Sequence, residues 1–266
     1  MMNIAHLEVD LHHGGRWTSL RGPRGREWLS TRPDALAARN ACQPGDPFID
    51  AGGLEECIPT IAGAYDHGDV WARTWRGNAS TATVQGDRFD LERRITINGS
   101  QVVASYRLAA EPGFRFVWAG HASVDFSESA RLVAPEGTRV RIWPEHWRRW
   151  PRLDQREGPW PAPEDTPIDG LQTDGSALFF MLIDQPELVV SDGGHLRFRL
   201  DAPGQPIAIA VWRNLGGWPE DAPYRGIAIE PAIGWHFDRD LAGPGETGIV
   251  GPTGTVEWQL TIEAAG

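Results

Sequence analysis

The chain has 266 residues, 41% of them hydrophobic, which is enough to bury a substantial core. It carries 25 basic and 36 acidic side chains, for a formal net charge of -11. This balance argues against nucleic acid and anionic membrane as partners, because both require a positive face. The net charge does not exclude a small anionic substrate held by a local group of arginines.

Cys42 and Cys57 are too few for a disulfide framework, so we expect free, buried thiols, with a Cys42–Cys57 disulfide as the alternative. The first ten residues lack a basic region followed by an apolar core, so no secretory signal is expected. No apolar stretch approaches the length that spans a membrane. These features predict a soluble, cytoplasmic protein, and a homodimer stays open.

Short apolar or alternating runs recur along the chain, separated by Gly, Pro, Asp or Asn, and they predict strands. Asn98-Gly99 lies between two of these runs and predicts a hairpin, because both residues tolerate a positive φ. The predicted strands are Ala5–Leu11, Arg88–Ile97, Gln101–Leu108, Arg115–Ala119, Ala177–Ile183, Leu196–Leu200, Ile207–Trp212, Gly226–Ile229 and Thr255–Ile262.

Helical sequence is scarce, because 31 glycines and 21 prolines disfavour long helices. Pro33–Asn40 predicts one short helix with a proline in its first turn. Glu145–Pro167 is rich in proline, contains Trp147–Trp150 and predicts a long surface loop. No linker divides the chain. We therefore expect residues 1–266 to form a single all-β domain, a large twisted antiparallel β-sandwich.

Three polar side chains at the ends of apolar runs are candidates for acid–base chemistry. His67 is flanked by Asp66 and Asp69, and a neighbouring carboxylate can fix its tautomer. His121 directly follows an apolar run. For each histidine the alternative is a solvated turn or a ring bonded to a backbone carbonyl. Glu230 ends a strongly apolar run, where a buried carboxylate without partners is costly and its pKa would rise.

The chain has 13 tryptophans, whose flat faces can stack on sugar rings, although core packing explains most of them. Asp69, Trp71 and Arg73 are candidates for binding the substrate. Trp71 would stack on the ring, and Arg73 would orient a hydroxyl or an anionic group. The alternative for these residues is ordinary packing or a solvated face. No second histidine stands at ligand spacing from His67, so no metal site is expected.

Taken in order, these segments resemble the aldose 1-epimerase (galactose mutarotase-like) superfamily over nearly the whole chain. Leu7–Leu29 is similar to the opening hairpin of that superfamily, and Gly52–Thr60 is similar to a glycine-rich segment. The segments that resemble its two active-site histidine motifs and its glutamate motif are Asp66-His67-Gly68, Trp118-Ala119-Gly120-His121 and Gly226–Gly234.

The resemblance implies a twisted β-sandwich with a sugar bound on a concave sheet, and an isomerase that interconverts α and β anomers. By this analogy Glu230 is the base at the C1 hydroxyl and His121 is the acid at the ring oxygen. His67 would stabilise the charge that develops near the ring oxygen. Ring opening needs no redox step, so no cofactor and no metal are expected.

The sequence departs from galactose mutarotases at the second histidine, which reads Gly120-His121-Ala122-Ser123 rather than Asn-His-x-Tyr-Phe. A Gly-Tyr-Asp-His segment is missing, and Pro231 follows Glu230. These departures point to a divergent branch with another sugar. They leave open a non-catalytic carbohydrate-binding protein on the same scaffold, and a mutarotase or epimerase for a phosphorylated or sulfonated hexose. The candidate arginines for such an anion are Arg73, Arg76, Arg213 and Arg225.

Overall fold

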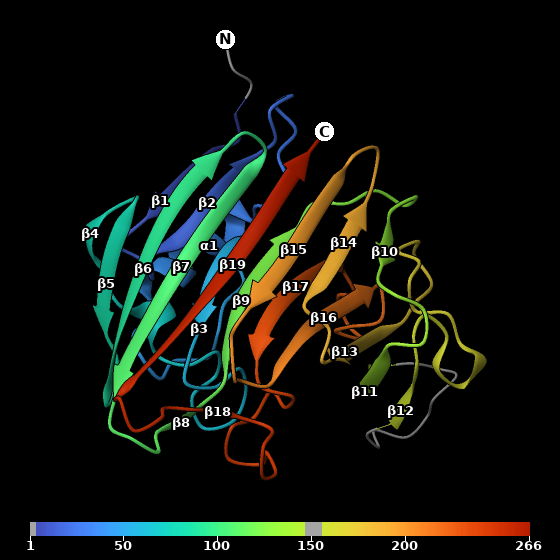
Figure 1. Ribbon diagram of the computed structural model, residues 1–266. Coiled ribbons are helices and arrows are strands. Elements are labelled where there is room, and N and C mark those ends of the chain that lie inside the picture. The colour runs from blue at the N-terminus through green and yellow to red at the C-terminus, as the bar shows by residue number, and fades with distance from the viewer. Residues whose placement is uncertain (1–3, 147–155) are drawn as a thin grey trace.

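Two large antiparallel sheets pack face to face in the computed structural model, which describes residues 4–146 and 156–266 (Figure 1). The nine-stranded sheet runs in the order β1 (His6–Asp10), β2 (Arg16–Arg21), β3 (Gly53–Cys57), β9 (Trp118–Val124), β17 (Arg225–Ile233), β16 (Ile207–Leu215), β13 (Ala177–Ile183), β11 (Arg139–His146) and β12 (Arg156–Pro159).

The eight-stranded sheet lies in front of the nine-stranded one in Figure 1. Its order is β10 (Arg131–Val133), β14 (Glu187–Ser191), β15 (His195–Asp201), β19 (Thr255–Ala265), β7 (Gln101–Ala110), β6 (Phe89–Asn98), β5 (Thr81–Gln85) and β4 (Arg76–Asn78). A short ribbon pairs β18 (Gly248–Ile249) with β8 (Arg115–Phe116). The helical segments are α1 (Pro33–Ala41), η1 (Val70–Ala72) and η2 (Pro163–Asp165).

The core lies between the two sheets because their strands present alternate side chains to it. In β6 the inward positions include Phe89, Leu91 and Ile95, while the residues between them face solvent. In β9, Trp118 and Ala122 face this core. The side chains between them therefore point to the outer face of the nine-stranded sheet, where the candidate site lies.

A buried polar network crosses the core beneath that site. Glu56 is fully buried in β3, and its Oε1 accepts hydrogen bonds from Arg93 and from the Tyr106 hydroxyl. Its Oε2 accepts a hydrogen bond from the Trp118 indole. Since each partner donates to the carboxylate, the charge is compensated inside an apolar core. The network links β3, β6, β7 and β9, and so it fixes the strand that carries His121.

The expected all-β class is confirmed, and each of the predicted strands coincides with or overlaps an observed one. The predicted helix is α1, which begins at Pro33 and ends one residue later than expected. The hairpin at Asn98-Gly99 is confirmed with a small shift. Asn98 pairs with Gln101, so the loop consists of Gly99 and Ser100, and only Gly99 of the two has a positive φ. Cys42 and Cys57 are free and buried.

The long loop expected over Glu145–Pro167 is wrong in part. Strand β11 continues to His146, and Arg156–Pro159 forms the edge strand β12 that pairs with it. The prolines misled the prediction, because Pro159 lies at the end of the edge strand β12, where a proline is tolerated. Trp147–Trp150 lies outside the described residues. Within residues 4–146 and 156–266, no helix has the length and apolar character to cross a bilayer.

Candidate functional site

Strands β9 and β17 place His121 and Glu230 side by side on the outer face of the nine-stranded sheet. The two strands keep one register on both sides of this point, with Ile229 opposite Ala122 and Ala232 opposite Ala119. That register puts Glu230 opposite His121. The ladder is interrupted there because Pro231 has no N–H to donate. The distance from His121 Nε2 to Glu230 Oε1 is 3.8 Å.

His67 reaches the same place from the loop between β3 and η1. Its backbone has a φ of 60°, a left-handed conformation that is uncommon for residues other than glycine. The next residue, Gly68, also has a positive φ, and a Cβ there would lie 2.0 Å from the carbonyl oxygen of Ile58. The Nδ1 of His67 lies 2.8 Å from Asp66 Oδ1, so the carboxylate orients the ring and leaves Nε2 free.

Phe48 lies against both imidazole rings. Its ring stacks on His67 with centroids 3.8 Å apart, and it meets His121 edge-on at 5.2 Å. The two imidazole centroids are 5.1 Å apart. The backbone N–H of Phe48 donates to Asp66 Oδ2, so the carboxylate that orients His67 also anchors the segment that covers it. The three polar side chains therefore form one cluster beneath an aromatic cover.

Burial shifts both members of the His121–Glu230 pair toward their neutral forms. Glu230 is 1% exposed, and burial raises the pKa of its carboxyl group, an effect that nearby His121 offsets only in part. His121 is 6% exposed, and burial lowers the pKa of its imidazole despite the carboxylates of Glu230 and Asp50. Glu230 Oε2 and His121 Nδ1 are buried and make no hydrogen bond within the described part of the chain.

An apolar cluster on this face accounts for the burial of Glu230. The carboxylate lies opposite Ala210 in β16. The cluster also contains Cys57, Met181 and Ala232, with Trp143, Phe179 and Phe237 packed against it. Within residues 4–146 and 156–266, no three His, Cys, Asp or Glu side chains gather as metal ligands. The arrangement can therefore exchange protons with a bound hydroxyl group in a largely dry environment.

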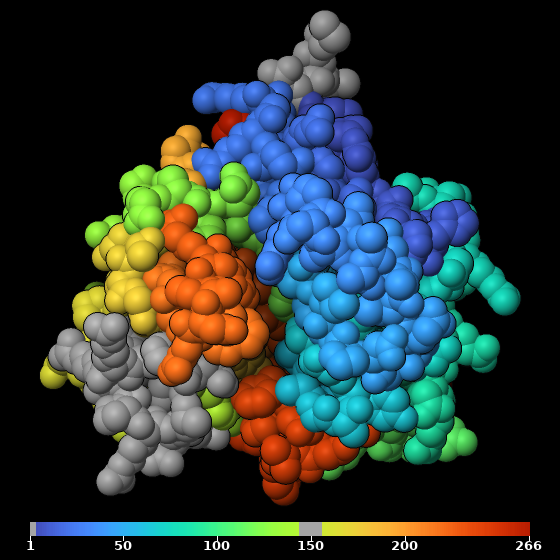
Figure 2. All heavy atoms as spheres, turned by 180° about the vertical axis from the view of Figure 1, so that it is seen from behind, coloured from blue at the N-terminus to red at the C-terminus, as the bar shows by residue number. Residues whose placement is uncertain are grey.

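A cleft of about 320 Å³ opens from His121 toward the surface. Ser123 and Ala228 lie on its floor strands, Asp50 and Arg32 line it from one side, and Trp212 lines it from β16. Figure 2 shows a hollow on this face between the blue segment near residues 30–50 and the orange connection between β16 and β17. The volume lies within the range of small-molecule sites.

Comparison with protein-family models and with curated proteins found no match to the sequence. Solved structures do match. The Slr1438 protein from Synechocystis sp. PCC 6803 superposes with a TM-score of 0.72 at 15% identity, covering 98% of this chain and 92% of that one. The galactose mutarotase related enzyme from Lactobacillus acidophilus gives a TM-score of 0.68 at 13% identity, covering 99% and 95%.

The chain has the galactose mutarotase-like fold. A galactose mutarotase-like protein from Lactobacillus casei ATCC 334 also superposes, with a TM-score of 0.65 at 13% identity over 98% of this chain and 97% of that one. The fold expected from the sequence resemblance is confirmed. At such low identities the likeness concerns the fold, and the chemistry has to be argued from the side chains.

Three of the residues that the sequence predicted for the site lie outside the cluster of His67, His121 and Glu230. Trp71 is fully buried beneath Phe48, and its indole N–H donates to the carbonyls of Asp66 and Gly68. Its ring is therefore not available to stack on a ligand in the cleft. Its contacts hold the loop that carries His67, which is a positioning role in place of the stacking role expected from the sequence.

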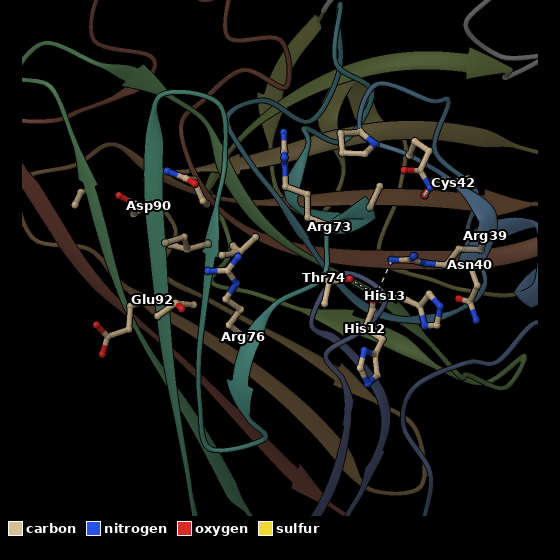
Figure 3. Close-up of a pocket in the computed structure, with 18 of the residues that line it drawn as sticks. His12, His13, Arg39, Asn40, Cys42, Arg73, Thr74, Arg76, Asp90 and Glu92 are labelled. Atoms are coloured by element: carbon tan, nitrogen blue, oxygen red, sulfur yellow. Dashed lines mark hydrogen bonds between the residues drawn. The ribbon is translucent and has the colours of Figure 1, made fainter.

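Asp69 and Arg73 pair with each other away from the cluster. Asp69 is buried, and its Oδ2 lies 2.9 Å from Arg73 Nη2. Arg73 lines a separate cavity of about 870 Å³ between α1 and β5–β6, where Figure 3 shows it among His13, Arg39 and Arg76. A substrate held at His121 would not meet these side chains. Their expected substrate-binding roles do not fit this placement.

The other arginines expected to hold an anion are also remote or bound within the protein. Arg213 donates to Gly170, Ser176 and Asp174. Arg225 lines the cleft, but its guanidinium donates to the backbone carbonyls of residues 126, 127 and 171. Arg76 lies in the cavity of Figure 3.

Sequence reasoning missed Phe48, Asp50 and Arg32. All three lie in or beside the irregular segment around α1, which carries no periodic pattern. The only local signal is Asp50, which precedes the glycine pair at the start of β3 and accepts a hydrogen bond from Gly52. No sequence pattern indicates that this segment folds over His67 and His121.

Proposed function

We propose that this protein is an isomerase that interconverts the α and β anomers of a sugar by acid–base catalysed ring opening. The observation that carries the proposal is the clustering of His67, His121 and Glu230, which are far apart in sequence, around His121, which lines the cleft. A protein that only binds sugars has no need for a buried carboxylate beside a buried imidazole, because both are costly to hold without hydrogen bonds.

Glu230 is proposed as the base. Its carboxylate takes the proton of the C1 hydroxyl while the bond between C1 and the ring oxygen breaks. The raised pKa that burial gives this carboxyl group makes the carboxylate a stronger base than an exposed glutamate. A positioned base or acid typically contributes about 10²- to 10⁴-fold to the rate of such a step.

His121 is proposed as the acid that delivers a proton to the ring oxygen. Burial lowers the pKa of this imidazole, which makes its protonated form a stronger acid. His67, with Nδ1 directed at Asp66, would present Nε2 to the same region and stabilise the developing charge. The open-chain aldehyde then rotates about its C1–C2 bond. Ring closure on the other face returns both protons and leaves each side chain in its starting form.

The names of structural neighbours support the substrate class, since one is a galactose mutarotase related enzyme and another a galactose mutarotase-like protein. The resemblance at three motifs points the same way. The small-molecule partner is therefore proposed to be an aldose whose hemiacetal carbon lies against the paired side chains of Glu230 and His121. Ring opening and closure are coupled to proton transfers and involve no net oxidation or reduction, so the proposal requires neither a metal nor a redox cofactor.

The test is polarimetry or NMR of aldoses placed out of anomeric equilibrium. Wild-type protein should accelerate equilibration of at least one aldose, and Glu230→Gln should lose at least about 10²-fold of that acceleration. Glu257→Gln, which changes an exposed glutamate in β19, is the matched control and should keep the wild-type rate. If wild type binds an aldose without accelerating its equilibration, the protein is a carbohydrate-binding protein and the proposal is wrong.

A further inference from the structure

The outer half of the cleft offers both hydrogen-bond donors and acceptors with no net charge. Its charged side chains are Arg32 and Arg225 against Asp50 and Asp125. The guanidinium of Arg225 already donates to three backbone carbonyls, and its Nε lies 3.5 Å from Glu128 Oε1. An anionic group in this cleft would therefore face two carboxylates with only Arg32 to compensate them.

Arg32 lines the cleft with a guanidinium whose donors have no hydrogen-bond partner among the described residues. Its side chain is 39% exposed, and its guanidinium lies over the Tyr224 ring at 5.0 Å. Its guanidinium makes no hydrogen bond to any residue that the structure describes. Its nearest charged partner is Asp50, with 3.9 Å between Nη1 and Oδ2. The guanidinium is thus held in place by a ring and a carboxylate while its N–H groups stay available for a ligand.

Asp50 supplies the matching acceptor. Its Oδ1 accepts hydrogen bonds from the Gly52 N–H and the Ser123 hydroxyl, which fix the carboxylate. Its Oδ2 faces Arg32 and the cleft, and it has no hydrogen bond from the described residues. Asp50 and His121 line the same cleft, so the Arg32–Asp50 pair lies beside the proposed reaction centre. Trp212 lines the cleft from β16 and offers an apolar wall.

We propose that the Arg32–Asp50 pair is the specificity-determining element of the cleft, and that it selects a neutral sugar by binding neighbouring hydroxyl groups. Arg32 donates to one hydroxyl oxygen, and Asp50 accepts from the adjacent hydroxyl. The C–H face of the ring rests on Trp212. A phosphate, sulfonate or carboxylate on the sugar is disfavoured because it would meet Asp50 and Asp125. This inference rests on the proposed function and names its substrate class.

The experiment measures dissociation constants by NMR titration of the full chain with probes matched in ring structure. The neutral probes are D-glucose, D-galactose and D-mannose, and the anionic probes are D-glucose 6-phosphate and D-glucuronate. Wild type should bind at least one neutral probe, and bind it more tightly than either anionic one. Arg32→Gln and Asp50→Asn should each weaken neutral binding by about tenfold or more. Asp50→Asn should also reduce the discrimination against D-glucose 6-phosphate.

The matched control is Arg76→Gln, an exposed arginine in the separate cavity, which should leave all constants unchanged. The inference is overturned if D-glucose 6-phosphate binds more tightly than the neutral sugars, if no neutral probe binds, or if both cleft variants bind like wild type. Because the readout is binding, its failure differs from failure of the proposed function. Binding of a neutral sugar that depends on Arg32 and Asp50, without anomer exchange, would support the inference and contradict the proposed isomerase activity.

Discussion

Glu230 and His121 face each other across neighbouring strands, with 3.8 Å between Oε1 and Nε2, and both are almost fully buried. Pro231 interrupts the strand ladder beside them. The remaining polar atoms, Glu230 Oε2 and His121 Nδ1, find no partner among the described residues. A buried polar atom without a hydrogen bond costs free energy that folding does not recover. The pair therefore lowers the stability of the fold and leaves polar atoms that can bind a ligand, as expected of a functional site.

Replacing Glu230 by glutamine should stabilise the protein at every pH above the ordinary pKa of glutamate, which is about 4.3. Burial raises the pKa of Glu230 in the folded state, so the folded chain binds a proton that the unfolded chain has lost. Wild-type stability relative to Glu230→Gln should therefore fall as pH rises from about 4.3 through the folded pKa, and then stay level. Thermal unfolding of both proteins across pH measures this difference. A glutamine variant that is less stable at neutral pH would contradict the assignment of burial as the dominant effect.

Phe48→Ala should expose the two imidazoles. The phenyl ring stacks on His67 and contacts His121, and it lies in a segment without regular secondary structure. Diethyl pyrocarbonate acylates accessible imidazole nitrogens, so modification of His67 and His121, followed by mass spectrometry of peptides, should be faster in the variant. Tyr65→Ala removes an exposed ring from the loop that carries His67 and serves as the control. Equal modification rates in Phe48→Ala and wild type would show that Phe48 is not the cover.

Gly68→Ala should destabilise the protein more than Gly99→Ala. Both glycines have a positive φ, so both substitutions carry the strain of an L side chain in that region. At Gly68 the new Cβ would also lie 2.0 Å from the Ile58 carbonyl oxygen, whereas at Gly99 nothing lies within 4 Å. Denaturant unfolding should show a loss of about 1 kcal/mol for Gly99→Ala and a clearly larger loss for Gly68→Ala. Anomer exchange should fall only in the Gly68 variant, since His67 would shift.

Glu56→Ala should destabilise the fold by about 3–5 kcal/mol, because it leaves Arg93 as a buried charge without its carboxylate. It also removes the acceptor for Tyr106 and Trp118. Equilibrium unfolding in urea measures the loss. Glu257→Ala, at an exposed position of β19, should change stability by less than about 1 kcal/mol. A loss of similar size in both variants would mean that the buried network adds little to stability.

The sequence predicted the fold class and the long strands because their alternation is visible residue by residue. It did not predict β3, whose residues Gly53–Cys57 are all buried although two of them are glutamates. Glu55 pairs with Arg39 of α1, and Glu56 belongs to the core network. These partners lie 16 and 37 positions away in the chain. No local pattern can indicate that two adjacent carboxylates are both compensated inside the protein.

The candidate site could be predicted only in part. His67, His121 and Glu230 stood out as polar side chains beside apolar runs, and the resemblance at three motifs implied their roles. The register between β9 and β17 explains why two of them meet. Trp71 looked like a stacking residue because tryptophan near a polar motif is a common feature of sugar sites. Its burial depends on how the irregular segment around Phe48 packs over it, which periodicity does not reveal.

The most direct test of the central claim is a crystal structure of Glu230→Gln with a bound aldose. The account predicts the C1 hydroxyl oxygen within about 3 Å of the side chain at position 230, and the ring oxygen at a similar distance from a nitrogen of His121. The same structure should show Arg32 and Asp50 on neighbouring hydroxyl groups. A sugar bound in the cavity of Figure 3, or in the cleft with its C1 atom directed away from position 230 and His121, would contradict the account.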